Sequence, residues 1–273
     1  MRHYVVPVAL VPAAVPVGIR ASREAAMTHG SEAVTRAGTS AAEPAGTDHP
    51  AHVWRLLSGL SAVAGSLDAL SYLAFGGVFA ANMTGTVVLL AIAITGSQAG
   101  ALRLVVALAA FVLGAIVGAR PTRRSPRPAA HAHPAWPGIT TATLAVELVV
   151  VTAWAVGWAL TGGNPGETAT YLLIAVAALA MGLQSSAAGR VGIGGVSTAY
   201  ITGTLSALAS QLTHRPARVR EAVLRAGIVL AYFGGAVAGA GLRSLSPSAA
   251  GWLPPAGLAA AVVAGWVRRG RAT

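Results

Sequence analysis

Apolar and polar stretches alternate along this chain. Eight apolar runs follow the first 55 residues, and they are Leu56 to Phe75, Ala80 to Thr95, Leu102 to Ala119, Ile139 to Leu160, Thr168 to Ala188, Val196 to Leu212, Ala222 to Leu242 and Trp252 to Val267. Several approach the roughly 20 residues that a helix needs to cross a ~30 Å hydrocarbon layer. Because no water satisfies backbone groups in that layer, we predict that these runs are α-helices.

The composition indicates an integral membrane protein in a lipid bilayer. Of the 273 residues, 55% are hydrophobic and only 10% are charged, with a mean hydropathy of +0.66. A soluble domain carries about a quarter charged residues. Residues 56–267 are therefore the predicted membrane domain. Residues 1–55 are too polar to bury a core and are predicted to be a disordered tail, and residues 268–273 form a basic C-terminal tail.

The net charge of +11 does not indicate a nucleic-acid partner. The arginines lie in the tails and between apolar runs, which is the distribution that sets membrane topology. No RNA- or DNA-binding motif accompanies them. We therefore interpret them as topology signals of a multi-pass membrane protein.

A short motif occurs twice in the chain. A shift of 118 positions places GGVFAANMTGT, from Gly76 to Thr86, over GGVSTAYITGT, from Gly194 to Thr204, with seven of eleven positions identical. A shift of 121 positions places AFVLGAIVGA over AYFGGAVAGA, so that the two G-x-x-x-G pairs coincide. Internal duplication explains both matches, with repeat one at about 56–160 and repeat two at about 168–267. The glycines of these pairs are expected to pack helices together; they are Gly114, Gly118, Gly235 and Gly239.

Arginines near the ends of the spans distinguish the possible topologies, because they collect on the cytoplasmic side. If all eight runs cross, nine of these arginines lie inside and six outside; if seven cross, the division is twelve and three. If the two Thr-Gly-Thr segments enter and return, six spans remain, both termini are cytoplasmic, and only Arg103 and Arg243 lie outside, against thirteen inside. We therefore predict an all-α polytopic bundle of six spans plus two re-entrant half-helices, with seven or eight spans as the alternatives.

With six spans the two halves have opposite orientations. Such inverted repeats are typical of secondary transporters, in which the N-termini of broken helices face the solute. Thr84 and Thr202 are predicted to cap short helices that begin near residues 85 and 203. Gly85 and Gly203 would let the backbone approach the solute closely. The alternative is that these small residues only pack helices together.

Two acidic residues, Asp68 and Glu147, lie inside predicted spans. A carboxylate there costs about 2.5 to 3.5 kcal/mol on insertion scales and usually faces the bundle interior or a watery cavity. Both are candidates for binding a cation or taking up a proton, with a structural hydrogen bond as the alternative. The remaining polar candidates for a central site are Asn82, Gln184 and Tyr200. Each of these side chains can equally form a structural hydrogen bond between helices.

The sequence shows no catalytic or metal-binding set. All seven histidines lie outside the predicted spans, and no Ser-His-Asp or Cys-His arrangement stands out. His131 and His133 lack the third ligand of a good metal site. We therefore expect a protein that is not an enzyme and that has neither a metal nor a cofactor.

The stretches GSLDALSYLAFGGVFAANMTGTVVLL, ALAMGLQSS and TAYITGTLSALA resemble the YoaK-type family of bacterial multi-pass membrane proteins, whose function is unknown. The resemblance covers about Leu56 to Val267 and implies six or seven spans. The matching positions are Asp68 and Ala69, Met83 to Gly85, Gly182 to Gln184, and Thr202 to Thr204. Thr86 and Ser185 depart from the pattern, since the family often has Asn at those places. The resemblance implies no substrate.

The duplicated motif and the buried acids lead to one main hypothesis. It is a secondary transporter or exporter of a small polar or anionic solute. Asp68 would be the coupling or cation-binding group, and Thr84, Gly85, Thr202 and Gly203 would shape the solute site. The second hypothesis is a membrane scaffold or interaction protein without transport activity. The oligomeric state does not follow from the sequence.

Overall fold

The computed structural model describes residues 51–96, 98–120, 138–190, 201–214 and 219–267, and these residues contain no strand. Residues 1–50 and 268–273, which make up most of the two predicted tails, lie outside the described residues, as does Tyr200. The predicted boundary at residue 55 is wrong, because the first described helix begins at Ala51. Val53 and Trp54 explain the difference, since both are buried apolar side chains that extend the helix toward its N-terminus.

The described part of each of the eight predicted runs contains a helix. The helices are α2 (Ala51–Ala74), α3 (Met83–Gly96), α4 (Gln98–Ala119), α5 (Gly138–Leu160), α6 (Glu167–Gly189), α7 (Ile201–His214), α8 (Val219–Leu245) and α10 (Leu253–Val267). A single extra turn, α9 (Pro247–Ala250), separates α8 from α10 and starts with a proline in its first turn. The all-α prediction is confirmed for the described residues.

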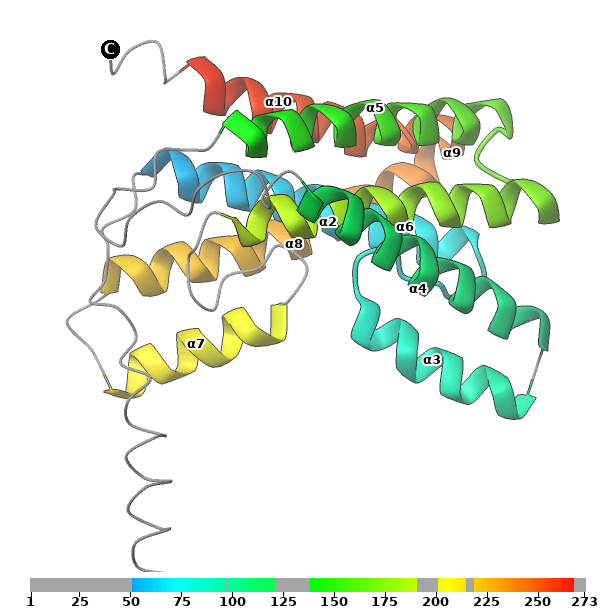
Figure 1. The fold of residues 1–273 in the computed structure, drawn as a ribbon, viewed down its shortest axis with the longest axis horizontal. Helices are drawn as coiled ribbons and strands as arrows, with labels where there is room; N and C mark the ends of the chain where they lie inside the picture. The colour runs from blue at the N-terminus through cyan, green and yellow to red at the C-terminus, as the bar shows by residue number, and fades with distance from the viewer. Residues whose placement is uncertain (1–50, 97, 121–137, 191–200, 215–218, 268–273) are drawn as a thin grey trace, which may run out of the picture. The chain divides into compact units, whose positions relative to one another are not determined.

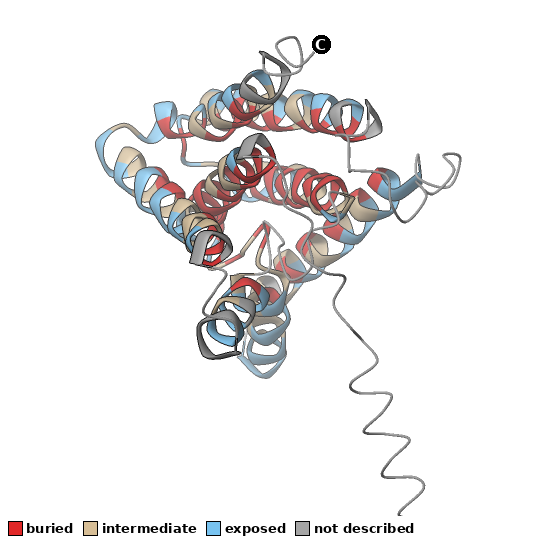
Figure 2. Cartoon of the chain, turned by 90° about the vertical axis from the view of Figure 1, so that its left-hand side faces the viewer, coloured by how far each residue is buried: buried red, intermediate tan, exposed pale blue. Residues whose placement is uncertain are grey.

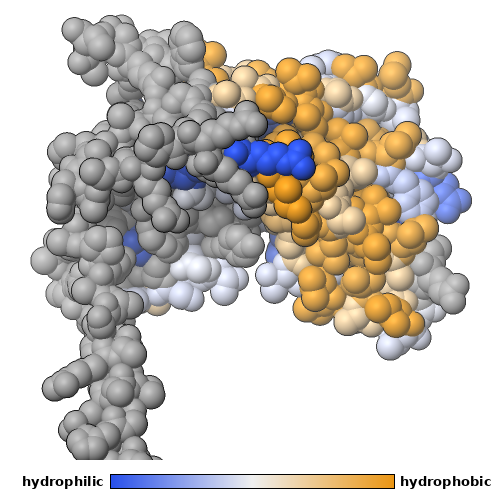
Figure 3. Space-filling model, viewed as in Figure 1, coloured by the Kyte–Doolittle hydropathy of each residue, from blue (hydrophilic) through white to orange (hydrophobic). Residues whose placement is uncertain are grey.

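Five of the described helices are long and apolar enough to cross a membrane, namely α2, α4, α5, α6 and α8. The sixth predicted span, α10, has 15 residues, or about 22 Å at 1.5 Å per residue. That length is shorter than a ~30 Å hydrocarbon layer. Hydrophobic residues cover most of the described surface on the side of α3 and α4 (Figure 3), as expected for a bundle in contact with lipid.

α2 and α6 are the inner helices of this membrane bundle. Within the most apolar window of each helix, 67% of the residues of α2 and 61% of those of α6 are buried, against 22% for α4 and 28% for α8. Figure 2 shows the same division, with buried positions gathered on the inner helices and exposed positions on the outer ones. The outer helices therefore present apolar side chains to lipid, among them Val149 and Phe233.

Backbone-to-backbone contacts at glycine hold α2 against α8. A Cβ atom on Gly235 would collide with the carbonyl oxygen of Ala62, and one on Gly65 would collide with that of Tyr232. Gly239 lies in the same interface, against the backbone of Ser66. Small residues of this kind let membrane helices pack closely, because van der Waals contact replaces the hydrophobic driving force.

The contact between α4 and α6 is built in the same way. A Cβ atom on Gly114 would collide with the carbonyl oxygen of Leu179, and one on Gly182 would collide with that of Phe111. Gly118 lies against the Ser186 side chain. The structure thus confirms the packing role predicted for the four glycines of the two G-x-x-x-G pairs. α10 packs on α2 and α5 packs on α6, and α5 and α10 also contact each other.

α3 and α7 are short helices that do not alternate in direction with the rest. α2 and α3 run the same way in Figure 1, as do α6 and α7, and each pair is followed by a helix that runs the opposite way. α3 packs on α4, and α7 packs on α8. The two short helices lie along the same side of the bundle, and their N-terminal ends face each other (Figure 1).

Candidate functional site

Asp68 lies near the C-terminal end of α2, and only 2% of its surface is exposed. Its Oδ1 accepts a hydrogen bond of 2.6 Å from the backbone N–H of Ala81, and its Oδ2 accepts one of 3.1 Å from the N–H of Asn82. The hydroxyl of Tyr232, on α8, donates a 2.5 Å hydrogen bond to the same Oδ2. One carboxylate therefore joins α2, α8 and the segment that leads into α3.

That segment, residues 75–82, leads from an exposed turn at Gly76 into the protein interior. Phe75, Val78 and Ala81 are each at most 2% exposed. Gly76 and Gly77 have φ angles of 73° and 85°, which an L side chain rarely adopts, and they turn the chain back from the end of α2. A buried connection must find partners for its backbone N–H groups, since no water is there to bind them. The Asp68 carboxylate supplies two of these partners.

Asn82 caps the N-terminus of α3. Its side-chain Oδ1 accepts a hydrogen bond of 3.2 Å from the N–H of Gly85, the third residue of the helix. The prediction that Thr84 caps a helix from residue 85 is wrong, because α3 begins at Met83 and Thr84 is exposed within its first turn. The threonine of this motif that makes hydrogen bonds in the interior is Thr86. It is fully buried, and its hydroxyl donates to the carbonyl oxygens of Phe79 and Asn82.

The second copy of the motif has the same division between exposed and buried residues. α7 begins at Ile201, so Thr202 lies inside its first turn and does not precede the helix as the cap prediction requires. Thr202 and Gly203 are exposed, whereas Thr204 is fully buried, like its counterpart Thr86. Gly85, in contrast to Gly203, lies against the side chains of Asn82 and Phe79.

Gln184 does not join the group around Asp68. Its side chain is buried, and its Nε2 donates a hydrogen bond of 3.0 Å to the carbonyl oxygen of Leu60. Leu60 precedes Asp68 by about two turns of α2, or roughly 12 Å. The amide therefore ties the two inner helices together at another level of the bundle.

Glu147, the second predicted acid, is fully buried on α5. Neither of its carboxyl oxygens has a hydrogen-bond partner among the described residues. Thr143 lies one turn before it, and its hydroxyl accepts a 2.8 Å hydrogen bond from the guanidinium of Arg190 at the end of α6. Arg190 also donates to the carbonyl oxygen of Gly118. The structure thus places the two predicted coupling residues in separate environments.

Two functional candidates are absent from the sequence-based prediction. Tyr232 is the side-chain partner of Asp68. The sequence signal that could have identified it is the alignment of the two G-x-x-x-G stretches, in which Tyr232 stands at the position of Phe111. Arg103, near the start of α4, lies over the ring of Tyr171 at 5.9 Å and has no ion pair among the described residues. It also borders the turn at Gly76, so it is a cation beside the entrance to the buried segment.

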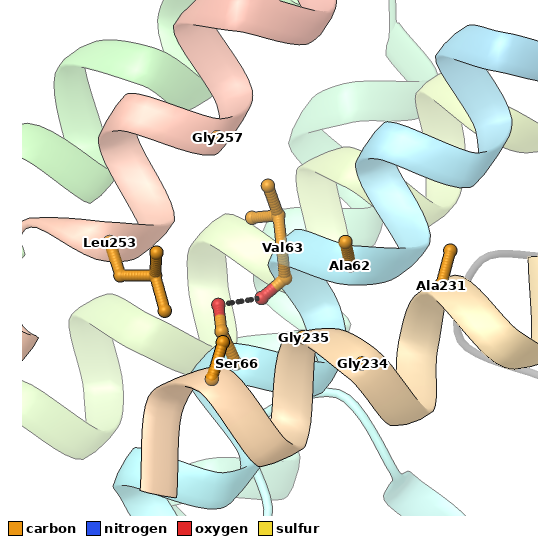
Figure 4. Close-up of a pocket in the computed structure, with 9 residues that line it drawn as sticks. Ala62, Val63, Ser66, Ala231, Gly234, Gly235, Leu253 and Gly257 are labelled. Carbon is orange, nitrogen blue, oxygen red and sulfur yellow. Dashed lines mark hydrogen bonds between the residues drawn. The ribbon is translucent and has the colours of Figure 1, made fainter. Parts of the chain in front are cut away.

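The pocket drawn in Figure 4 lies elsewhere. It is a groove of about 320 Å³ between α2, α8 and α10, and its lining includes Val63, Gly234, Ala238 and Leu253. Ser66 contributes a hydroxyl to this lining, and that hydroxyl donates to the carbonyl oxygen of Val63 within the same helix. Such a lining offers a polar solute few partners, and none of the predicted site residues contributes to it. Among the described residues there is also no group of three or more His, Asp or Glu side chains that could hold a metal ion.

Comparison with known proteins gives the family. A family described as "Protein of unknown function (DUF1275)" matches residues 56–264. The chain is also 33% identical, over 190 residues, to "UPF0700 transmembrane protein YoaK" of Bacillus subtilis (strain 168), a match that covers 67% of this chain and 80% of that protein. No solved structure matches the chain. The resemblance noted from the sequence is confirmed: the chain belongs to the DUF1275 family and is similar to the transmembrane protein YoaK.

Proposed function

We propose that this protein is a secondary transporter or exporter of a small polar or anionic solute in the bacterial inner membrane. In this proposal it has six spans, two inverted repeats and two re-entrant half-helices, α3 and α7. Both termini are cytoplasmic, and the protein is not an enzyme. The observation that carries the proposal is the buried segment 75–82, which Asp68 holds and which leads into the capped N-terminus of α3.

Matched contacts support the two repeats. In the sequence alignment of the two repeats, the offset that aligns Gly65 with Gly182 also aligns Ala62 with Leu179. Both aligned pairs belong to the equivalent helices α2 and α6. The shift of 121 that places Gly114 on Gly235 also places Phe111 on Tyr232. The glycine contacts between α2 and α8 therefore correspond one by one to those between α6 and α4. Two copies of one unit related by a two-fold axis produce this correspondence.

The directions of the short helices support re-entrant segments. α3 and α7 have 14 residues each, or about 21 Å, and α10 is almost as short, so direction and not length distinguishes α3 and α7 from the spans. Each runs in the same direction as the long helix before it (Figure 1), as expected for a segment that enters the membrane and returns. The topology of six spans also puts Arg103 and Arg243 at the outer ends of α4 and α8 and the other arginines of the membrane domain at the inner ends.

Electrostatics favours a polar or anionic solute. The N-terminus of a helix carries a partial positive charge and exposed N–H groups, and those of α3 and α7 face each other (Figure 1). Arg103 adds a full positive charge on the outer side, without an ion pair among the described residues. Asn82, Gly85, Thr202 and Gly203 lie at these two helix starts and remain the proposed solute-binding residues, with Thr84 beside them.

Asp68 is the proposed coupling residue because its oxygens hold the segment 75–82 as acceptors. Adding a proton or cation to the carboxylate would weaken the bonds from the N–H groups of Ala81 and Asn82. The start of α3 would then be free to move. A change in charge at Asp68 is in this way linked to a change in the shape of the site.

The test is a binding screen followed by flux. Full-length protein in lipid nanodiscs is mixed with mono- and dicarboxylates, phosphate and neutral amino acids, and its melting temperature is measured. A ligand at 100 times its dissociation constant stabilises a protein by about 2.7 kcal/mol. We expect at least one anion to raise the melting temperature, and Arg103→Gln to weaken that effect. The same anion should enter proteoliposomes that contain the protein.

The scaffold hypothesis makes the opposite prediction. It expects no compound in the panel to stabilise the protein or to cross the membrane, while Thr86→Ala and Thr204→Ala still reduce its stability. That combination of results would remove transport as the function. Thr86 and Thr204 are suitable positions because both are fully buried at the starts of the two short helices.

A further inference from the structure

The inner face of α5 carries a line of buried polar groups that the proposed transport site does not use. Thr140, Glu147 and Trp154 are spaced seven residues apart, which places them on one face of the helix, about 10 Å from one to the next. At most 1% of each residue is exposed. The Thr140 hydroxyl, both Glu147 oxygens and the Trp154 ring N–H have no hydrogen-bond partner among the described residues. Groups of this kind in a native interior need an explanation.

The charges around Glu147 do not neutralise it. α5 packs mainly on α6, α9 and α10, and the described parts of α9 and α10 contain no charged residue. On α6 the charged residues are Arg190, which binds Thr143 and Gly118, and Glu167, which is exposed at the opposite end of the helix. An ionised carboxylate without hydrogen bonds or a nearby opposite charge is strongly disfavoured inside a membrane bundle.

A proton fits this site better than a metal ion. Cations such as Ca²⁺ and Mg²⁺ take about six oxygen ligands, whereas the described residues contain no group of three or more His, Asp or Glu side chains that could hold one. A carboxylic acid needs only its own proton to become neutral. Thr143 lies one turn before Glu147 on α5, and its hydroxyl accepts a hydrogen bond from the guanidinium of Arg190.

We propose that Glu147 is a proton-binding site, a carboxylic acid kept neutral within the bundle that exchanges its proton along Thr143 with the water at the Arg190 end of α6. In the forward step the O–H bond of Glu147 breaks, the proton passes to water, and a carboxylate remains; the reverse step restores the acid. This inference goes beyond the proposed function, because it requires no solute.

Infrared spectroscopy of the full-length protein in nanodiscs at neutral pH tests the site. The carbonyl stretch of a protonated carboxylic acid should be present in the wild type and absent in Glu147→Gln. Glu167→Gln, which changes an exposed glutamate of α6, should leave that band in place. Because glutamine copies the shape of the neutral acid, Glu147→Gln is expected to fold. If it does not fold, Glu147→Asp provides the test, since it should shift the band and not remove it.

The path is tested by transfer into D₂O, which shifts the band as the acid exchanges its proton for a deuteron. Thr143→Val should slow this exchange about tenfold, which corresponds to a barrier about 1.4 kcal/mol higher. The matched control is Thr152→Val, because the Thr152 hydroxyl binds only the carbonyl of Leu148 on its own helix. A band that Glu147→Gln leaves unchanged would overturn the site, and equal exchange rates in the Thr143→Val variant and the wild type would overturn the path. Neither result depends on whether the protein transports a solute.

Discussion

The hydroxyl of Tyr232 lies 2.5 Å from a carboxyl oxygen of Asp68, although the two residues are far apart in the sequence. This contact fixes α8 of the second half against α2 of the first half, at the level where the buried segment 75–82 enters the bundle. The carboxylate therefore has a structural role whether or not it also couples transport.

Removing the Tyr232 hydroxyl should destabilise the protein. We expect Tyr232→Phe to lower the free energy of unfolding by about 1.5 to 3 kcal/mol, the usual contribution of a hydrogen bond to a charged group. Tyr72→Phe is the control, because 45% of Tyr72 is exposed. Unfolding in mixed micelles, followed by circular dichroism, measures both variants. Equal stability of Tyr232→Phe and the wild type would contradict the contact.

Asp68→Asn should cost more than the loss of the tyrosine hydroxyl. The amide group turns one acceptor into a donor that faces the N–H of Ala81 or Asn82 or the hydroxyl of Tyr232. We expect a loss of about 1 to 3 kcal/mol for each buried donor left without a partner. Because Asp68 and Tyr232 are in contact, the double variant should lose less stability than the sum of the single ones. Additive losses would show that the two side chains act independently.

Two adjacent glycines of α8 should respond differently to the same change. Gly235→Ala places a methyl group against the carbonyl oxygen of Ala62 and should destabilise the protein by about 1 to 3 kcal/mol. Gly234→Ala meets no atom within 4 Å and should be neutral or stabilising by up to about 1 kcal/mol, since alanine favours helices. Thermal unfolding of the purified variants compares them. The reverse order would mean that α8 is rotated relative to α2.

The cap of α3 gives a second matched pair. Asn82→Ala removes the acceptor for the N–H of Gly85 and should cost about 0.5 to 2 kcal/mol. Thr84→Ala, in the exposed first turn, should change stability by less than about 0.5 kcal/mol. Hydrogen exchange of the amides of the first turn of α3 is the local readout. A faster exchange in Thr84→Ala than in Asn82→Ala would restore the original prediction for the threonine.

Single cysteines can determine the topology, because the native chain contains none. With six spans, Gly100→Cys should react with an impermeant thiol reagent from outside the cell. Arg120→Cys, at the other end of α4, should react only from inside. Eight spans reverse both results. The two variants therefore distinguish these topologies in intact cells.

The positions of the helices could be predicted from the sequence because each apolar run must satisfy its own backbone groups in lipid. The glycine contacts could be predicted as well, since the matched G-x-x-x-G pairs select small residues at an interface. In both cases the relevant signal extends over many residues or occurs twice.

The details of the site could not be predicted in the same way. Thr84 and Asn82 are both good capping residues, and the choice between them depends on where the buried segment 75–82 ends. That segment is shaped by the positive φ angles of Gly76 and Gly77 and by a carboxylate on another helix. Tyr232 reaches Asp68 only through the packing of α8 on α2, and no short stretch of sequence encodes such a contact.

The exchange of partners between the halves has a consequence for biosynthesis. α2 packs most closely on α8, and α6 packs most closely on α4. The main packing partner of each of these helices therefore lies in the other half of the chain. During translation α2 leaves the ribosome long before α8, and Asp68 must enter the membrane before Tyr232 is available. The first half therefore has to remain in the translocon or in a loosely packed state until the second half arrives. Expressed separately, the two halves should each be degraded, whereas their co-expression should rescue both.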